Sequence, residues 1–203
     1  YSGKTGMDIR PAPPAGAAAV PDSHGLNLWR GDETLARLAG CYLENDVFTH
    51  LRPHFDRLGA LAGGTLDDLA GVADRHPPVL HHRSRNGADA QRIEKHPAYQ
   101  ELERQAFGAF GLAAMSHRGG VLGWPLPLPP LAKYLITYLF VQAEFGLMCP
   151  VSMTDSLTRT LRKYGDQALV DRYLPALVSQ DMDTLCQGAM FMTEQAAGSD
   201  IAA

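Results

Sequence analysis

"RKYGDQALVDRYLPALVSQDMDTLCQGAMFMTEQAAGSD", residues 162–200, is the stretch that decides the fold. Asp166 can cap a helix that follows Gly165, because its carboxylate accepts a hydrogen bond from a free N–H of the first turn. After Asp181 the helical spacing of apolar residues is lost, and residues 184–192 are typical of a buried strand with a possible bulge at Gly188. The stretch therefore predicts a helical domain, residues 22–183, that passes into a β domain, residues 184–203.

The residues before this stretch are predicted to be helical almost throughout. Apolar residues recur three or four positions apart, or at sums of these spacings, as one buried stripe of an amphipathic helix requires. A proline inside a helix removes a hydrogen bond, so we expect a bend at Pro53, and Gly63-Gly64 should end the element. The stripe consists of Leu35, Leu38, Tyr42, Phe48, Leu51, Phe55 and Leu58.

Shorter helices are predicted on both sides of a polar segment. Thr65, with Asp68 three residues later, can cap a helix over residues 65–74. A polar loop rich in His and Arg, including His81-His82, follows this helix. Pro97 then fits the first turn of another helix, where its missing N–H costs nothing. The apolar face of that helix is Tyr99, Leu102, Ala106, Phe107 and Phe110.

Residues 131–149 form the most apolar run of the chain. A membrane span needs about 20 predominantly apolar residues, and Lys133, Gln142 and Glu144 interrupt this run. We therefore expect a helix buried in the centre of a bundle. Three of its aromatic residues either line an apolar tunnel for a substrate or pack in the core, and these are Tyr134, Tyr138 and Phe140.

Two further features flank the predicted central helix. The segment "WPLPLPPL", residues 124–131, is expected to be an extended connection because proline cannot continue a helix. Thr154 or Asp155 can cap a later helix that ends at Gly165.

Composition excludes several classes of protein. With 203 residues and 45% hydrophobic residues the chain is globular, and its net charge of −4 gives no general attraction to nucleic acid. The cysteines, Cys41, Cys149 and Cys186, are odd in number and far apart, which argues against a disulfide framework or a zinc site. A reducing cytoplasm fits best, and no secretory signal is expected.

Several short motifs carry no function on this interpretation. Residues 3–5 resemble the end of a phosphate-binding loop but lack the earlier glycine and the preceding strand. We expect residues 1–21 to be disordered, or vector-derived before a native start at Met7. His50 and His54 share one helix face without further ligands, so no metal site is predicted. No GxSxG elbow for a serine nucleophile is present.

Two motifs in order resemble the acyl-CoA dehydrogenase family of flavoproteins. A helix with a "YG…YLP.L" pattern precedes a strand and a "TEP.AGSD" loop in that family, and residues 164–200 follow the same order. "HPAY" at 96–99 and "CPVSMT" at 149–154 resemble the alkylation-response (AidB-like) branch, and Gln195, in place of the usual proline, mildly favours it. The resemblance implies a mainly α fold: an N-terminal helical bundle followed by the first strand and loop of a β-barrel-like middle domain.

The resemblance also implies an FAD site at the final loop. Backbone groups and one hydroxyl at the end of a strand can hold the hydrogen-bonding edge of a flavin ring and adjust its electron affinity. A glycine lets the backbone approach a pyrophosphate, and a serine donates to its oxygens, while Glu194 and Asp200 tie the turn. The predicted cofactor-binding residues are Met190, Met192, Thr193, Gly198 and Ser199, and Ser199 also contacts acyl-CoA.

The implied reaction is α,β-dehydrogenation of an acyl-CoA thioester, with hydride transfer to flavin N5. The family's glutamate base lies in a C-terminal domain, so no catalytic residue is assigned here and the chain is expected to be part of a longer protein. An electron-transfer flavoprotein or other acceptor would take the electrons, and the full-length protein would be a homotetramer. The alternative is an alkylation-response flavoprotein that associates with DNA and has weak dehydrogenase activity. A third possibility is that the helical domain is an interaction module.

Overall fold

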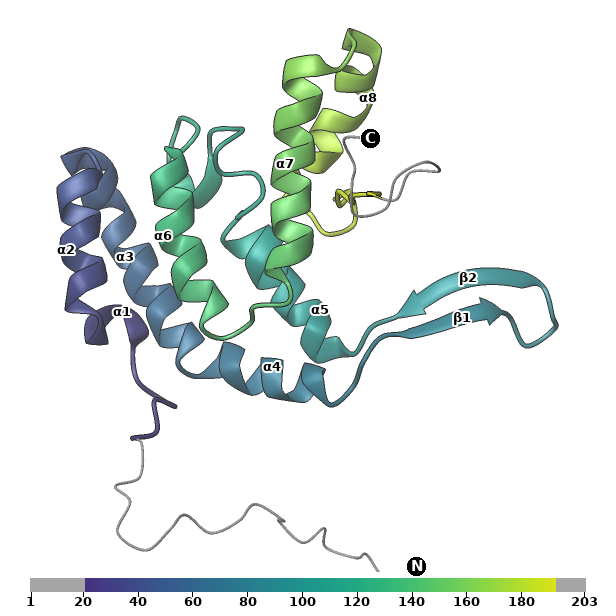
Figure 1. Cartoon of the computed structure of the whole chain (residues 1–203), viewed down its shortest axis with the longest axis horizontal. Helices are drawn as coiled ribbons and strands as arrows, with labels where there is room; N and C mark the ends of the chain where they lie inside the picture. Colours follow the sequence, from purple (N-terminus) through teal and green to yellow (C-terminus); the bar gives the residue numbers. More distant parts are fainter. Residues whose placement is uncertain (1–20, 193–203) are drawn as a thin grey trace, which may run out of the picture.

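The computed structural model describes residues 21–192, which form eight α-helices and one two-stranded sheet (Figure 1). The mainly helical fold predicted from the sequence is confirmed. The first half of the helical body consists of α1 (Leu28–Gly31), α2 (Glu33–Tyr42), α3 (Asn45–Ala62) and α4 (Thr65–Asp74).

The single long helix predicted from Leu35 to Leu58 is wrong, because the chain forms two helices there. Leu43 and Glu44 adopt extended backbone between α2 and α3, with ψ angles of 144° for both residues. The helix α3 runs through Pro53 and ends at Gly63. Leu35, Leu51, Phe55 and Leu58 are buried as predicted, whereas Leu38 and Tyr42 are exposed.

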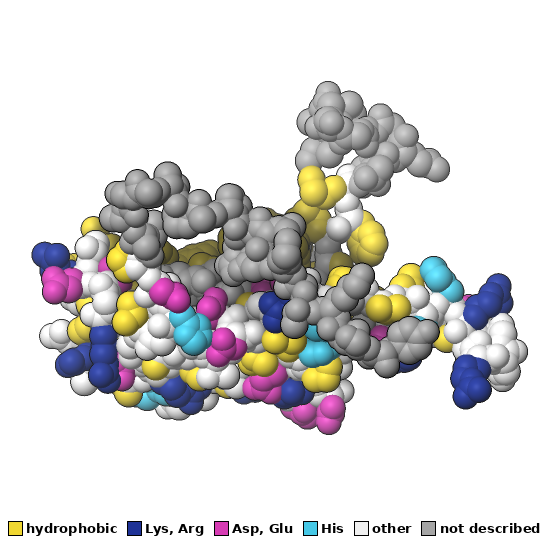
Figure 2. All heavy atoms as spheres, turned by 90° about the horizontal axis from the view of Figure 1, so that it is seen from below, with side chains coloured by type: hydrophobic (Ala, Val, Ile, Leu, Met, Phe, Trp, Pro, Cys, Tyr) yellow, Lys and Arg dark blue, Asp and Glu magenta, His cyan; other side chains and the backbone are white. Residues whose placement is uncertain are grey.

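The predicted polar loop between α4 and α5 is instead a β-hairpin that projects from the body (Figure 1). Strands β1 (Val79–Arg83) and β2 (Asp89–Glu94) pair antiparallel, with Val79 opposite Glu94. Gly87 has a φ of +82° in the connecting turn, a conformation that glycine adopts without strain. Basic side chains gather at the tip of this hairpin (Figure 2).

The helix predicted to start at Pro97 is confirmed as α5 (Pro97–Glu103). Its first turn is capped by the side chain of His96, and it continues as a π-turn, η1 (Arg104–Ala109). An irregular connection with one 3₁₀ turn, η2 (Val121–Gly123), leads to α6. Residues 124–129 contain no helix or strand, as predicted for 124–131, but the prediction is wrong for Pro130 and Leu131, which form the start of α6.

The second half of the body consists of α6 (Pro130–Val141), α7 (Met148–Tyr164) and α8 (Gln167–Leu177). The single helix predicted over residues 131–149 is therefore wrong, because this apolar run is divided between α6, the turn at residues 142–147 and the start of α7. Because α7 begins at Met148, Thr154 and Asp155 lie in its middle and are buried, so their predicted role as a cap is wrong. Asp166 caps α8 as predicted, by accepting a hydrogen bond from Leu169 N at 2.9 Å.

Two smaller expectations also differ from the structure. Thr65 does not cap α4, since Gly64 occupies the cap position and no side chain bonds to the first turn. Residues 184–192 are not assigned as a strand, because none of the described residues lies beside them in a ladder. A strand needs a neighbour to satisfy its N–H and C=O groups.

One core holds the helices together. Its centre includes Phe55, whose ring stacks on Trp29 with centroids 4.6 Å apart, together with Phe107, Phe110 and Phe140. Within residues 21–192, no helix combines the length and the apolar character needed to cross a bilayer.

Candidate functional site

Residues 184–192, which precede the predicted FAD loop, are anchored on the helical body. Backbone N–H groups make two of the contacts: Cys186 N donates to Ala176 O of α8 at 3.1 Å, and Gly188 N donates to Thr154 Oγ1 of α7 at 2.9 Å. Thr154 Oγ1 in turn donates to Pro150 O at 2.7 Å, so this hydroxyl both donates and accepts a hydrogen bond. The segment therefore has a fixed position against α7 and α8.

At Gly188 the backbone of the segment lies so close to the backbone of α7 that only glycine fits. A Cβ at this position would lie 2.7 Å from the carbonyl oxygen of Met153 and 3.0 Å from Thr154 Cα. Backbone atoms of a buried helix cannot give way to relieve such an overlap. The bulge that the sequence suggests at Gly188 is absent, and the glycine instead lets the segment lie directly on α7.

A buried carboxylate makes a third anchor. Gln187 Nε2 donates to Glu103 Oε1 at 3.0 Å, and Lys95 Nζ contacts the same oxygen at 2.6 Å. Glu103 lies at the end of α5, and only 6% of its side chain is exposed. An anion in such surroundings needs charged or hydrogen-bonding partners. Lys95 and Gln187 supply them, and the segment is thereby tied to α5.

The apolar residues after these anchors face outward. Met190, Phe191 and Met192 are 58%, 92% and 57% exposed, which is far more than large apolar side chains usually show. Met190 and Met192 are the two predicted flavin contacts that the structure describes, and they lie on this exposed stretch. The other three, Thr193, Gly198 and Ser199, lie outside the described residues, as do Glu194, Gln195 and Asp200.

A buried polar network joins α6, α7 and the connection between η1 and η2. Asp155 accepts from Lys133 Nζ at 2.7 Å and from His117 Nε2 at 2.8 Å. The three side chains are 12%, 6% and 5% exposed respectively. Burial raises the pKa of Asp155, but the hydrogen bonds from His117 and Lys133 outweigh burial and hold the pKa below its usual value.

The sequence did not indicate this network as a site. Lys133 stands in an otherwise apolar helix, and a charge there requires a partner. Asp155 also falls on the buried face of α7, which includes Val151 and Thr158. These two facts together would have suggested a buried ion pair. Nothing in the pattern, however, points to His117, which lies 38 positions away from Asp155.

The three aromatic residues of α6, which were predicted either to line a substrate tunnel or to pack in the protein core, differ in their exposure. Phe140 is fully buried in the core, whereas Tyr134 and Tyr138 are 60% and 48% exposed. The two tyrosines line an open groove of about 350 Å³ between α2 and α6. Its other lining residues are Asp32, Thr34, Leu35, Leu38, Leu131 and Leu135. The described residues thus place these tyrosines on an open surface groove.

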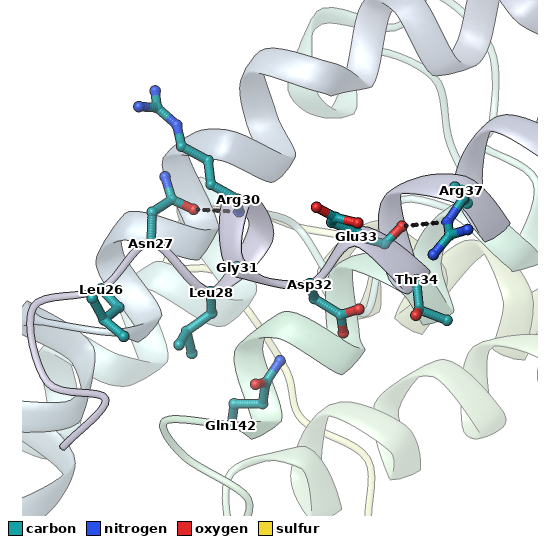
Figure 3. Close-up of a pocket in the computed structure, with 10 residues that line it drawn as sticks. All are labelled: Leu26, Asn27, Leu28, Arg30, Gly31, Asp32, Glu33, Thr34, Arg37 and Gln142. Carbon is teal, nitrogen blue, oxygen red and sulfur yellow. Dashed lines mark hydrogen bonds between the residues drawn. The ribbon is translucent and has the colours of Figure 1, made fainter. Parts of the chain in front are cut away.

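A second, polar pocket of about 630 Å³ lies along α1 and α2 (Figure 3). Three of its polar groups serve the fold: Asn27 caps α1, Asp32 caps α2, and Arg30 forms a bidentate ion pair with Asp56. This pocket lies at the other end of the body from α8 (Figure 1). We therefore assign it a structural role.

Histidines and cysteines do not gather into a metal centre in the part of the chain that the structure describes. His50 Nε2 bonds to Leu122 O at 2.9 Å, and its ring lies 5.5 Å from that of His54. Burial, together with the nearby His50 and Arg57, lowers the pKa of His54. The three cysteines are exposed free thiols.

The sequence of this chain matches a known protein family. Residues 19–184 match the adaptive response protein AidB N-terminal domain. The chain belongs to the AidB N-terminal domain family. This assignment confirms the resemblance to acyl-CoA dehydrogenases and to their alkylation-response branch.

Individual relatives of this AidB N-terminal domain agree with the assignment. Acyl-CoA dehydrogenase family member 11 of Caenorhabditis elegans is 22% identical over 179 residues, which cover 87% of the chain and 28% of the relative. The solved structure Bd2924 apo-form is 27% identical with a TM-score of 0.73, over 87% of the chain and 34% of its own. Caenorhabditis elegans ACDH-11, solved in complex with C11-CoA, also has a TM-score of 0.73, at 21% identity, over 95% of the chain and 32% of its own.

The chain thus spans about a third of the length of these relatives. The fold is that of the N-terminal helical domain of acyl-CoA dehydrogenases.

Proposed function

We propose that this chain is the N-terminal part of an FAD-dependent acyl-CoA dehydrogenase, which oxidises an acyl-CoA thioester between its α and β carbons. The observation that carries the proposal is the anchored segment, residues 184–192. Its start is fixed on α5, α7 and α8, and its apolar end points outward immediately before the loop predicted to hold FAD. The relative solved with C11-CoA supports acyl-CoA as the substrate class.

The described residues fit a flavin in two respects. Met190, Phe191 and Met192 offer exposed apolar surface, against which a flat aromatic ring system can pack. The close approach at Gly188 fixes where that surface lies relative to α7. Bound FAD would supply the electron acceptor for the oxidation. In this proposal the chain's own residues position the ring and form one wall of the site. The base, the electron acceptor protein, a tetramer and a cytoplasmic location belong to the same proposal for the whole protein.

A second candidate is an alkylation-response flavoprotein that associates with DNA and has weak dehydrogenase activity. The match to the adaptive response protein AidB N-terminal domain favours it. The chain's own net charge of −4 does not contribute the electrostatic attraction that DNA binding needs. Under this alternative a different part of the protein would make the DNA contacts.

Flavin reduction in the full-length protein tests the proposal. The protein is loaded with FAD and mixed anaerobically with acyl-CoAs of increasing chain length while flavin absorbance is followed. Bleaching by at least one acyl-CoA is expected. Stable FAD binding without bleaching by any acyl-CoA would remove the dehydrogenase proposal, and a salt-dependent DNA complex in the same preparation would favour the alternative.

Two glycine variants test the role of the anchored segment. Gly188→Ala places a Cβ against the backbone of α7 and should displace residues 188–192, so that FAD occupancy falls. Gly40→Ala is the matched control, because a Cβ there meets only the Phe48 ring at an ordinary 3.6 Å. Equal FAD occupancy in the two variants would show that the anchored segment does not position the flavin.

A further inference from the structure

A basic pocket lies at the C-terminal half of α7, which is drawn in green in Figure 1. Its volume is about 310 Å³, close to the lower end of the range for small-molecule sites. Three cations of α7 line the pocket together with the first residue of α6 and two residues of the connection between η1 and η2. The lining residues are Ser116, His117, Pro130, Arg159, Arg162 and Lys163.

Among the residues that the structure describes, no carboxylate forms an ion pair with the three cations of this pocket. Within residues 21–192, Arg159 and Arg162 form no hydrogen bond or ion pair, and Lys163 lies over the Tyr164 ring at 4.9 Å. Some other basic side chains of the described residues have a carboxylate partner: Arg30 pairs with Asp56, and Lys133 pairs with Asp155. In a chain with a net charge of −4, such a group of cations is a local exception. Clustered like charges repel each other, and an anion between them removes that cost.

A buried hydroxyl supports the same interpretation. Ser116 Oγ is the buried side-chain oxygen or nitrogen that has no hydrogen-bond partner among the described residues. Buried polar atoms nearly always have a partner, so an orphaned hydroxyl beside a pocket is a position where a water molecule or a ligand can bind. The neighbouring His117 is held in place by Asp155, whose charge is already balanced by Lys133. The network behind the pocket therefore does not supply a free negative charge to the cations.

The end of a helix explains only part of the cluster. Arg162 and Lys163 lie in the last turn of α7, where positive charge compensates the partial negative charge of the free carbonyls. Arg159 lies outside that last turn. A helix-end effect also leaves Ser116 Oγ without a partner. A ligand that bridges the cations and the hydroxyl accounts for all of these groups.

We propose that this pocket binds a phosphate group of a small molecule. Arginine presents two N–H groups in the plane of its guanidinium, which matches two oxygens of a phosphate, and lysine adds a point charge. The group can come from free inorganic phosphate or from the phosphate of a nucleotide coenzyme. The inference goes beyond the proposed dehydrogenase function and does not depend on it.

Calorimetric titration of the 203-residue chain tests the pocket. One arm uses inorganic phosphate and the other uses adenosine 3′,5′-bisphosphate as a nucleotide probe. Saturable binding of either is expected, and clearly tighter binding of the nucleotide would identify a coenzyme phosphate as the ligand. Adenosine 3′,5′-bisphosphate is the nucleotide end of coenzyme A, but neither arm contains flavin or a thioester, so binding is measured separately from flavin reduction. No saturable binding in both arms would overturn the proposal.

Variants assign the binding to these residues. Arg159→Ala and Arg162→Ala should each weaken binding about tenfold or more, which corresponds to about 1.4 kcal/mol. Ser116→Ala should weaken it roughly threefold, since a neutral hydrogen bond contributes less. Arg172→Ala removes the same charge from an exposed arginine of α8 outside the pocket and should leave affinity unchanged. Equal losses in Arg172→Ala and Arg159→Ala would show non-specific attraction and would overturn the proposal.

Discussion

Asp155→Asn is expected to destabilise the helical domain strongly, because it leaves the ammonium of Lys133 buried without a counter-charge. The carboxylate accepts hydrogen bonds of 2.7 and 2.8 Å, and the three side chains of the network are 5–12% exposed. Breaking a buried ion pair by removing one partner costs about 3–5 kcal/mol. In a domain of this size, 1 kcal/mol shifts the melting temperature by roughly 2–4 °C, so a fall of about 6–20 °C is expected.

Thermal and urea unfolding followed by circular dichroism measure this loss, with Asp56→Asn as the matched control. Asp56 also accepts two close hydrogen bonds from a cation, at 2.6 and 2.8 Å, but its ion pair with Arg30 is exposed to solvent. Solvent screening makes exposed pairs weak, so the control should lose far less. If Asp155→Asn costs no more than Asp56→Asn, the buried network does not stabilise the fold.

The same network predicts a dependence on pH. The pKa of Asp155 is lowered in the folded state, so its stabilisation is complete above the unfolded value of about 3.9 and is lost as pH falls through the lower folded value. Asp155→Asn should lack this part of the acid-induced loss. Combining it with Lys133→Met removes the stranded charge, so the double variant should be less destabilised than the sum of the two single variants.

Three further changes have expected outcomes. Phe55→Ala removes a fully buried ring stacked on Trp29 and should cost about 3–5 kcal/mol in urea unfolding. Gly63→Ala drives a Cβ into the carbonyl of Leu26 and should cost about 1–3 kcal/mol, whereas an unchanged midpoint would show that the N-terminal turn is not packed there. Burial and basic neighbours lower the pKa of His54, so stability should fall as pH drops below about 6.5, and His54→Gln should flatten that slope.

Helix starts and ends were predictable where one residue type determines them. Pro97 and Asp166 stand at the first turns of α5 and α8 for reasons that are local in sequence: a missing N–H and a capping carboxylate. The break between α2 and α3 was missed because Tyr42 and Phe48 are six residues apart, a sum of two helical spacings. The helical spacing of apolar residues therefore continues across Leu43 and Glu44, and it does not reveal that the helix is broken there.

The hairpin was missed for a different reason. Apart from His81, which is partly exposed, its residues are exposed on both faces. The alternation that normally marks a half-buried strand is therefore absent. Its one local signal is the dipeptide Asn86-Gly87, which favours a tight turn between strands. A two-stranded hairpin outside a larger sheet is marginal in water, so a turn signal alone does not predict one.

The candidate site was only partly predictable, because its supports come from distant segments. The sequence predicts a flavin loop after this segment, but the residues that anchor the segment, Thr154 and Glu103, are 34 and 84 positions away from their partners. Such contacts depend on how α5 and α7 pack, which no local pattern encodes. Asp155 illustrates the same limit, since a residue that resembles a cap became the centre of a buried ion network once α7 began at Met148.

The way in which residues 184–188 are anchored explains why the apolar residues that follow them are exposed. Glycine at 188 and the hydrogen bonds to Thr154 and Glu103 hold the start of the segment against the helices, so Met190, Phe191 and Met192 cannot turn inward to reach the core. Three adjacent apolar side chains with more than half of their surface exposed are unfavourable in water and mark a surface that binds something. In the proposed function a flavin and the neighbouring β segments cover this surface. The helical domain would then act as the rigid support that sets the position of the cofactor.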